Sequence, residues 1–176
     1  RWVAMSNIDE TPLVDLILAE QLQYTNAETA ERAGLTLEQA TRLWRNLGFP
    51  DPGDETAFGE ADVTAAAVVA LAVEHQILDE GTVFRLTRAL GQTMSRLADW
   101  QVSILVDQLE VDIERGKSNS RAGAALELAA TAVPGFERLM VHVWRRHLAA
   151  AASRVTALGE KEQALLSTDM TVGFAD

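Results

Sequence analysis

The fold class is decided by residues 82–115, which read TVFRLTRALGQTMSRLADWQVSILVDQLEVDIER. Apolar side chains recur in this stretch at steps of mostly three and four residues, which is the period of an α-helix. The sequence therefore predicts one long amphipathic helix here, with Gly91 as a candidate for a bend. The recurring positions are Val83, Leu86, Leu90, Met94, Leu97, Gln101, Ile104 and Leu105.

The residues before this stretch also favour helix. Thr11-Pro12 predicts the start of a short helix, because Thr can cap a helix and Pro fits its first position. Two further short helices are predicted over 26–34 and 36–48, each ended by a glycine, and an Ala- and Val-rich helix is predicted from about residue 60 to Glu74 or His75. Two prolines and a glycine within 49–54 predict the loop between them.

The residues after it predict two more helices and a different ending. A small-residue helix over 121–133 is expected to stop at Pro134-Gly135, and a last long helix is expected over 136–158. An apolar stripe is predicted along this last helix, formed by Phe136, Leu139, Met140, Val143 and Leu148. The final residues alternate apolar with small or polar side chains, which is typical of a strand. A lone strand has no partner in an otherwise helical chain, so we expect the sheet to continue beyond it.

These patterns predict an all-α fold with a defined organisation. Ala and Leu dominate the apolar residues, which favours helix over strand. The expected parts are a ragged or appended start (1–10), a helical domain (11–158) that contains a helix-turn-helix subregion (11–52) and a helical bundle (59–158), a linker (159–169) and a terminal strand (170–176).

Composition excludes several classes of function. The chain has no cysteine, so disulfides and thiolate metal sites are excluded and a cytoplasmic setting is expected. Its net charge of −11 argues against a general attraction to nucleic acid or to anionic lipid. Its apolar windows are shorter than the roughly 20 residues of a membrane span, so membrane insertion is not expected.

The tail carries a resemblance to a known family. Residues Thr171-Val172-Gly173-Phe174-Ala175-Asp176 resemble the first strand of class III adenylate and guanylate cyclase domains, where a Phe-x-Asp opens the catalytic sheet. The resemblance implies that Asp176 is a ligand for Mg or Mn in the complete enzyme. Gly173 departs from the bulkier residue that is usual in the family.

The block 30–52 and the later Ala- and Leu-rich helices resemble the helical regulatory domain that precedes the catalytic domain in actinobacterial, mycobacterial-type adenylate cyclases. Such kinship implies a regulatory, dimerising fragment that is not an enzyme by itself. Its expected partners are a second copy of the chain and its own catalytic domain, which makes cAMP from ATP. The resemblance further implies control by pH and, in some members, a bound fatty acid.

A second resemblance supplies the alternative function. The predicted helix-turn-helix is similar to that of the MerR type of DNA-binding transcriptional regulator, which would meet phosphates with Lys and Arg. Between Asn26 and Val63, however, eight acidic residues outnumber the three basic residues Arg32, Arg42 and Arg45. We therefore favour a packing module over a nucleic-acid partner.

No catalytic constellation is apparent, so the site candidates are histidines. His142 and His147 lie on the last predicted helix with Arg145 and Arg146 between them. Histidine changes charge in the physiological range, and residues four apart on a helix are neighbours, so a protonated His142 would lie beside Arg146. These four residues are the candidates for a pH switch, with surface or interface imidazoles as the alternative.

Other residues carry structural predictions. Trp44 and Trp100 fall on apolar faces and are expected in the core, and His75 is expected to cap the end of its helix. The acidic group of Asp107, Glu110, Asp112 and Glu114 is interpreted as the solvated side of a helix in preference to a metal site, because even-spaced positions on a helix diverge.

Overall fold

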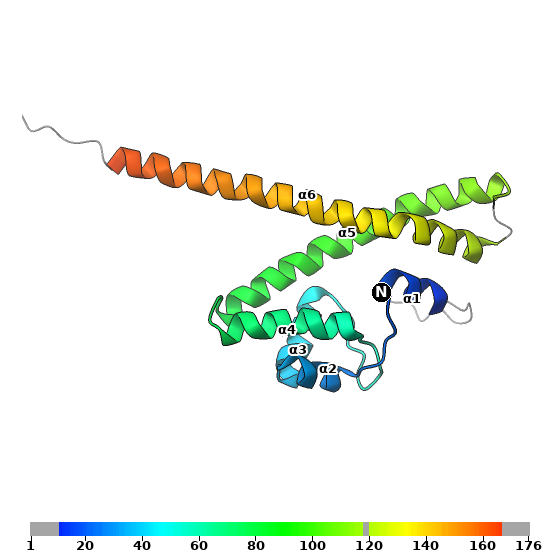
Figure 1. Cartoon of the computed structure of the whole chain (residues 1–176), viewed down its shortest axis with the longest axis horizontal. Coiled ribbons are helices and arrows are strands. Elements are labelled where there is room, and N and C mark those ends of the chain that lie inside the picture. The colour runs from blue at the N-terminus through cyan, green and yellow to red at the C-terminus, as the bar shows by residue number, and fades with distance from the viewer. Residues whose placement is uncertain (1–10, 118–119, 167–176) are drawn as a thin grey trace, which may run out of the picture. The chain divides into compact units, whose positions relative to one another are not determined.

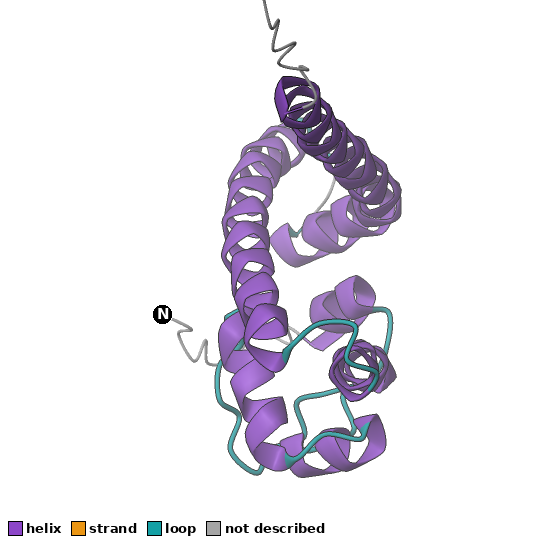
Figure 2. Cartoon of the chain, turned by 90° about the vertical axis from the view of Figure 1, so that its left-hand side faces the viewer, coloured by secondary structure: helices purple, strands orange, loops and turns teal. Residues whose placement is uncertain are grey.

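The computed structural model describes residues 11–117 and 120–166. In these ranges the chain is entirely helix and loop, with one isolated antiparallel bridge between Tyr24 and Phe58 (Figures 1 and 2). The predicted all-α fold is confirmed. The helices are α1 (Thr11–Leu18), α2 (Asn26–Ala33), α3 (Leu37–Leu47), α4 (Glu60–Glu74), α5 (Glu80–Glu114) and α6 (Arg121–Leu166).

The short helices begin and end where the sequence predicts. Thr25 caps α2 and Thr36 caps α3, each accepting a hydrogen bond from a backbone N–H three residues later. Gly34 and Gly48 end these helices with positive φ angles of 77° and 85°, a conformation that glycine adopts without steric cost. Helix α4 ends at Glu74, and His75 is its C-cap residue as expected.

Trp44 organises the core that these helices share. Its ring stacks on Phe58 with centroids 4.9 Å apart, and only 3% of the residue is exposed. The indole Nε1 donates to Asn26 Oδ1 over 2.9 Å, and Asn26 Nδ2 donates to Thr41 Oγ1 over 2.8 Å. The buried polar groups are thus paired, which removes the cost of burying them. Ala33, Leu43, Ala66 and Phe84 complete this core.

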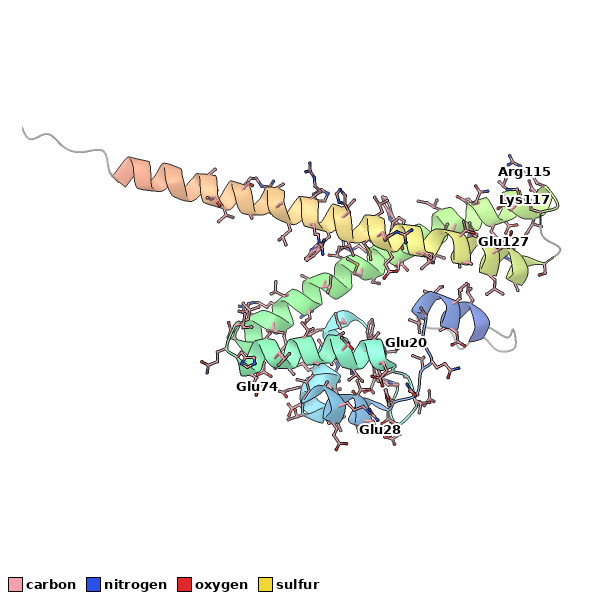
Figure 3. All side chains as sticks on the ribbon, in the orientation of Figure 1. Glu20, Glu28, Glu74, Arg115, Lys117 and Glu127 are labelled. Atoms are coloured by element: carbon pink, nitrogen blue, oxygen red, sulfur yellow. The ribbon has the colours of Figure 1, made fainter. Side chains whose placement is uncertain are left out.

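The loop before α4 is fastened to the segment before α2. Tyr24 and Phe58 exchange backbone hydrogen bonds of 2.9 and 3.1 Å. The Glu20 carboxylate lies beside the start of α4 and accepts from the Ala61 N–H over 3.0 Å (Figure 3). A carboxylate at this position also complements the positive end of the helix dipole. Contacts among the described residues thus hold α2, α3, α4 and α5 together around Trp44.

Gly91 has a packing role in α5. It is buried, and a Cβ built on it would lie 2.5–2.6 Å from backbone atoms of Leu47 at the end of α3. Real Cβ atoms do not approach backbone so closely, so only glycine fits without a shift of one helix. The end of α3 thus packs directly on the backbone of α5.

We expect Gly91→Ala to lower the free energy of unfolding by about 1–3 kcal/mol, because the added methyl group overpacks this contact. The matched control is Gly135→Ala, since a Cβ at Gly135 meets nothing within 4 Å. That change should be neutral or stabilise by about 0.5–1 kcal/mol through helix propensity. Urea unfolding followed by circular dichroism measures both, and equal effects would contradict the close approach.

Asp79 caps the start of α5, which begins two residues earlier than predicted. Its carboxylate accepts from the Thr82 hydroxyl over 2.5 Å and from the Thr82 backbone N–H over 2.9 Å. These two hydrogen bonds hold the pKa of Asp79 below its ordinary value of 3.8. A depressed carboxyl pKa contributes stability that is complete above the unfolded value and is lost as pH falls through the folded value.

Asp79→Ala should therefore lower the urea midpoint at pH 7, and the difference from the parent protein should shrink as the pH falls below 3.8. Asp99→Ala removes an exposed carboxylate from the interior of the same helix and should leave the midpoint nearly unchanged at every pH. A difference for Asp79→Ala that grows toward acid pH would refute the assignment of the cap.

Helix α6 continues through both positions at which the sequence predicts a break. It runs as one helix of 46 residues through Pro134 and on to Leu166, so the predicted stop at Pro134-Gly135 is wrong, and residues 159–166 of the predicted linker are helical. A proline inside a helix removes one backbone hydrogen bond and costs about 3 kcal/mol. The remaining hydrogen bonds of a 46-residue helix can offset this cost. The segment after Gly159 is rich in Glu, Lys, Gln and Leu, which are good helix formers.

Several predictions lie outside the described residues. They concern the start of the chain (1–10), the last part of the linker (167–169), the strand (170–176) and the metal ligand Asp176. The chain divides into two units, one up to Ala130 and one from Thr131, which is the greater part of α6.

Candidate functional site

The second unit presents an apolar seam along α6. We use "the seam" for Val141, Trp144, Leu148, Ala151, Val155 and Leu158, which follow one another at alternating steps of three and four. Trp144, Leu148, Val155 and Leu158 are between 53% and 72% exposed. A strict repeat of 3.5 residues is the pattern of two helices that supercoil around each other. The seam therefore has the form of a helix-to-helix interface.

The seam differs from the stripe that the sequence predicts on this helix. Phe136, Leu139 and Val143 do share one face, as the predicted stripe has it. Leu148 follows Leu139 by nine residues, which turns it by about 180° around the helix axis. Leu148 therefore belongs to the seam, and its inclusion in the stripe was wrong.

The switch candidates lie on the same stretch of α6. His142, Arg145, Arg146 and His147 are all exposed. Because α6 is continuous, Arg138 lies four residues before His142, and Arg145 and Arg146 lie three and four residues after it. Side chains at these spacings are neighbours on a helix. Among the described side chains, no acidic group forms an ion pair with this cluster. Protonated His142 would thus be a fourth positive charge beside three arginines.

His147 has different surroundings from His142. Its helical neighbours are Val143, Trp144, Ala150 and Ala151, all uncharged, and two of them belong to the seam. In the heptad that the seam defines, Val141 and Leu148 take one apolar position and Trp144 the other. His147 then takes the flanking position that borders a partner helix. The two histidines that the sequence analysis treated as one group therefore differ in their surroundings: His142 has arginine neighbours and His147 has uncharged neighbours.

Two of the four acidic residues at the end of α5 form ion pairs. The sequence analysis had kept a metal site as the alternative for this group. Asp112 accepts from Lys117 Nζ over 2.8 Å, and Glu110 accepts from Arg121 over 2.5 Å. Lys117 lies at the turn that follows α5 (Figure 3). The bond from Lys117 lowers the pKa of the Asp112 carboxyl from its ordinary value. In the described ranges, no group of three or more His, Asp or Glu side chains is placed to hold a metal ion.

The arginines of the predicted helix-turn-helix are largely engaged within the fold. Arg32 stacks over the Tyr24 ring at 4.2 Å from the centroid, and Arg42 stacks over Phe84 at 4.1 Å. Such cation–π contacts contribute to packing and hold the guanidinium groups against the protein. The end of α3 meets α5 at Gly91. This arrangement is that of a packed module.

Trp100 was predicted in the core, and the structure corrects this. It is 75% exposed on α5, near the exposed Val102 and Ile104. Helical periodicity identifies an apolar face but not what covers it, so the prediction could not distinguish a core from an interface. Among the helices of the described residues, none combines the length and apolar character that a bilayer crossing requires.

Comparison with known proteins identifies relatives over nearly the whole chain. No family model matches the sequence. A protein of Streptomyces coelicolor named adenylate cyclase is 37% identical over 164 residues, which are 93% of this chain and 42% of that protein. A Streptomyces griseus protein of the same name is 35% identical, over 92% of this chain and 40% of its own length.

A third adenylate cyclase, from Glutamicibacter nicotianae, is 30% identical over 91% of this chain and 43% of that protein. The chain is homologous to actinobacterial proteins named adenylate cyclase. It spans about two fifths of the length of these relatives. The resemblance that the sequence predicts is thereby confirmed at the level of the cyclase relationship.

Proposed function

We propose that this chain is the regulatory and dimerising part of an adenylate cyclase, and that a separate catalytic domain makes cAMP from ATP. Two observations support the proposal. The chain matches actinobacterial adenylate cyclases over nine tenths of its length while it spans two fifths of theirs. Its described residues form helices with an exposed seam, and the seam is the observation that carries the proposal.

In this proposal, two copies of α6 pair in parallel through the seam. Burying a Leu or Val side chain contributes roughly 1.5–3 kcal/mol, so several seam positions together can hold a dimer. A parallel pair brings the C-terminal ends of both helices to one place. Class III active sites are built between two catalytic domains, as the resemblance implies, so this pairing would set their relative orientation. Asp176 would then serve as a ligand for Mg or Mn in the complete enzyme.

The chain offers a matched pair of variants to test the dimer. Leu148, in the seam, and Leu139, off the seam, are both 53% exposed on α6. Leu148→Glu places a charge in the interface and should convert the dimer to a monomer in sedimentation equilibrium. Leu139→Glu carries the same change on another face and should leave the dimer intact. Loss of the dimer in both variants, or in neither, would contradict the seam.

The arginine cluster around His142 supports a pH-responsive role for α6. Protonation adds like charge beside Arg138, Arg145 and Arg146, which disfavours this arrangement of the helix. A two-state change in α6 needs a difference of only a few kcal/mol to alter the orientation of domains that follow it. His147 supplies a second candidate at the edge of the seam.

In the complete cyclase, His142→Ala should flatten the change in activity with pH, because it removes the imidazole whose protonation adds charge beside the arginines. Arg146→Gln, which removes one neighbouring positive charge, should weaken the same change without abolishing it. His147→Ala tests the second position. Unchanged pH profiles for both histidine variants would remove α6 from the pH response.

A bound fatty acid is implied by the resemblance and a cytoplasmic location is expected from the absence of cysteine, and both stay predictions. No observation favours the MerR-like alternative, since two of the three arginines in that region stack on aromatic rings.

A further inference from the structure

A cationic cavity lies where the end of α3 meets α5. Arg45 lines it from the last turn of α3, and Arg88 and Arg96 line it from α5. The cavity measures about 610 Å³ and is open to solvent. Its remaining lining consists of Asn46, Gly48, Gly91, Gln92 and Ser95.

The geometry of the two helices brings these groups together. Arg88, Gln92 and Arg96 follow one another at steps of four, so they form one row along α5. Gly91 lets the end of α3 approach this row, which places Arg45 at the same cavity. The arrangement depends on the close packing of α3 on α5 and is therefore held by the fold.

The cavity is positively charged although the protein as a whole is acidic. The chain carries a net charge of −11, yet none of the residues that line the cavity is acidic. Within the described ranges, none of its three guanidinium groups takes part in an ion pair or a ring contact. Like charges gathered without counter-charges repel each other, so an anion that neutralises them gains binding energy from all three.

We propose that this cavity binds a small polyphosphate anion. Guanidinium groups present forked donors that match phosphate oxygens in pairs, and Asn46, Gln92 and Ser95 add neutral donors. A small anion interacts mainly within a screening length of about 8–10 Å, and the charged side chains that line the cavity are all arginines. An extended polyanion such as DNA or an acidic protein would also meet the negative surface of the whole chain. The local positive charge therefore favours a compact ligand.

The shared chemistry is a chain of two or three phosphates, either free or as the tail of a nucleotide. No aromatic or large apolar side chain lines the cavity, so nothing there would recognise a base. Free tripolyphosphate should accordingly bind as tightly as ATP. This binding site is independent of the proposed cyclase role, because it is tested on this chain alone.

Isothermal titration calorimetry of the 176-residue chain with sodium pyrophosphate, at about 150 mM salt and without divalent metal, tests the proposal directly. Arg88→Gln/Arg96→Gln should weaken binding at least about tenfold, equivalent to about 1.4 kcal/mol. Arg115→Gln/Arg154→Gln removes the same charge from exposed positions outside the cavity and should leave the affinity unchanged. Circular dichroism checks that both variants keep their helices.

Ser95→Glu gives a second, independent variant, because it introduces a carboxylate into the lining while all three arginines remain. It should weaken pyrophosphate binding as well. Equal affinities for tripolyphosphate and ATP would support a site that binds the phosphate chain and makes no contact with the base. Binding of ATP alone, no binding of pyrophosphate at about 1 mM, or equal losses in the two arginine pairs would each overturn the proposal.

Discussion

The proposed dimer depends on one physical constraint: a row of apolar side chains on α6 is exposed to water, and burying that row is favourable. The seam places Trp144, Leu148, Val155 and Leu158 in water along one edge of a helix of 46 residues. A helix held only by its own hydrogen bonds gains little stability, since most helical stability in proteins comes from packing an apolar face. A second helix with the same repeat would cover the seam, and in the proposed dimer a second copy of the chain supplies that helix.

Around Trp44 the N-terminal unit buries its apolar side chains internally, whereas Trp100 on α5 stays 75% exposed. Trp44 is stacked, buried and hydrogen-bonded to Asn26, and Gly91 lets α3 close on α5. The helices around Trp44 therefore need no partner to satisfy their polar groups. The packed core around Trp44 and the exposed seam are the basis on which we propose association through α6. A continuous α6 joins the two roles, because a helix of this length, about 69 Å, transmits a rotation along its axis.

The sequence predicted those features that local chemistry determines. Thr25, Thr36, Gly34 and Gly48 have capping roles that depend on their immediate neighbours, so the ends of α2 and α3 could be predicted closely. The predicted stop at Pro134 was wrong, because the cost of the proline was outweighed by the hydrogen bonds of the helix on both sides of it. Trp100 misled because a helical period looks the same whether the face meets a core or a partner.

The candidate sites divide in a similar way. His142 could be found from its spacing to Arg146, and Arg138 lies four residues before His142 within the same predicted helix, so the sequence already contained the whole cluster. The heptad of the seam was present in the sequence and was obscured by the neighbouring Phe136 and Leu139 face. The cavity of Arg45, Arg88 and Arg96 joins residues more than 40 positions apart, so only the packing of α3 on α5 shows it.

A cysteine cross-link tests the parallel pairing of α6 most directly, because the chain has no cysteine of its own. Ala151 occupies an inner position of the seam, and Ala149 lies two residues away on another face. On oxidation, Ala151→Cys should form a disulfide-linked dimer in high yield while Ala149→Cys stays largely unlinked. Equal cross-linking of both variants, or a monomeric Ala151→Cys protein, would contradict the account.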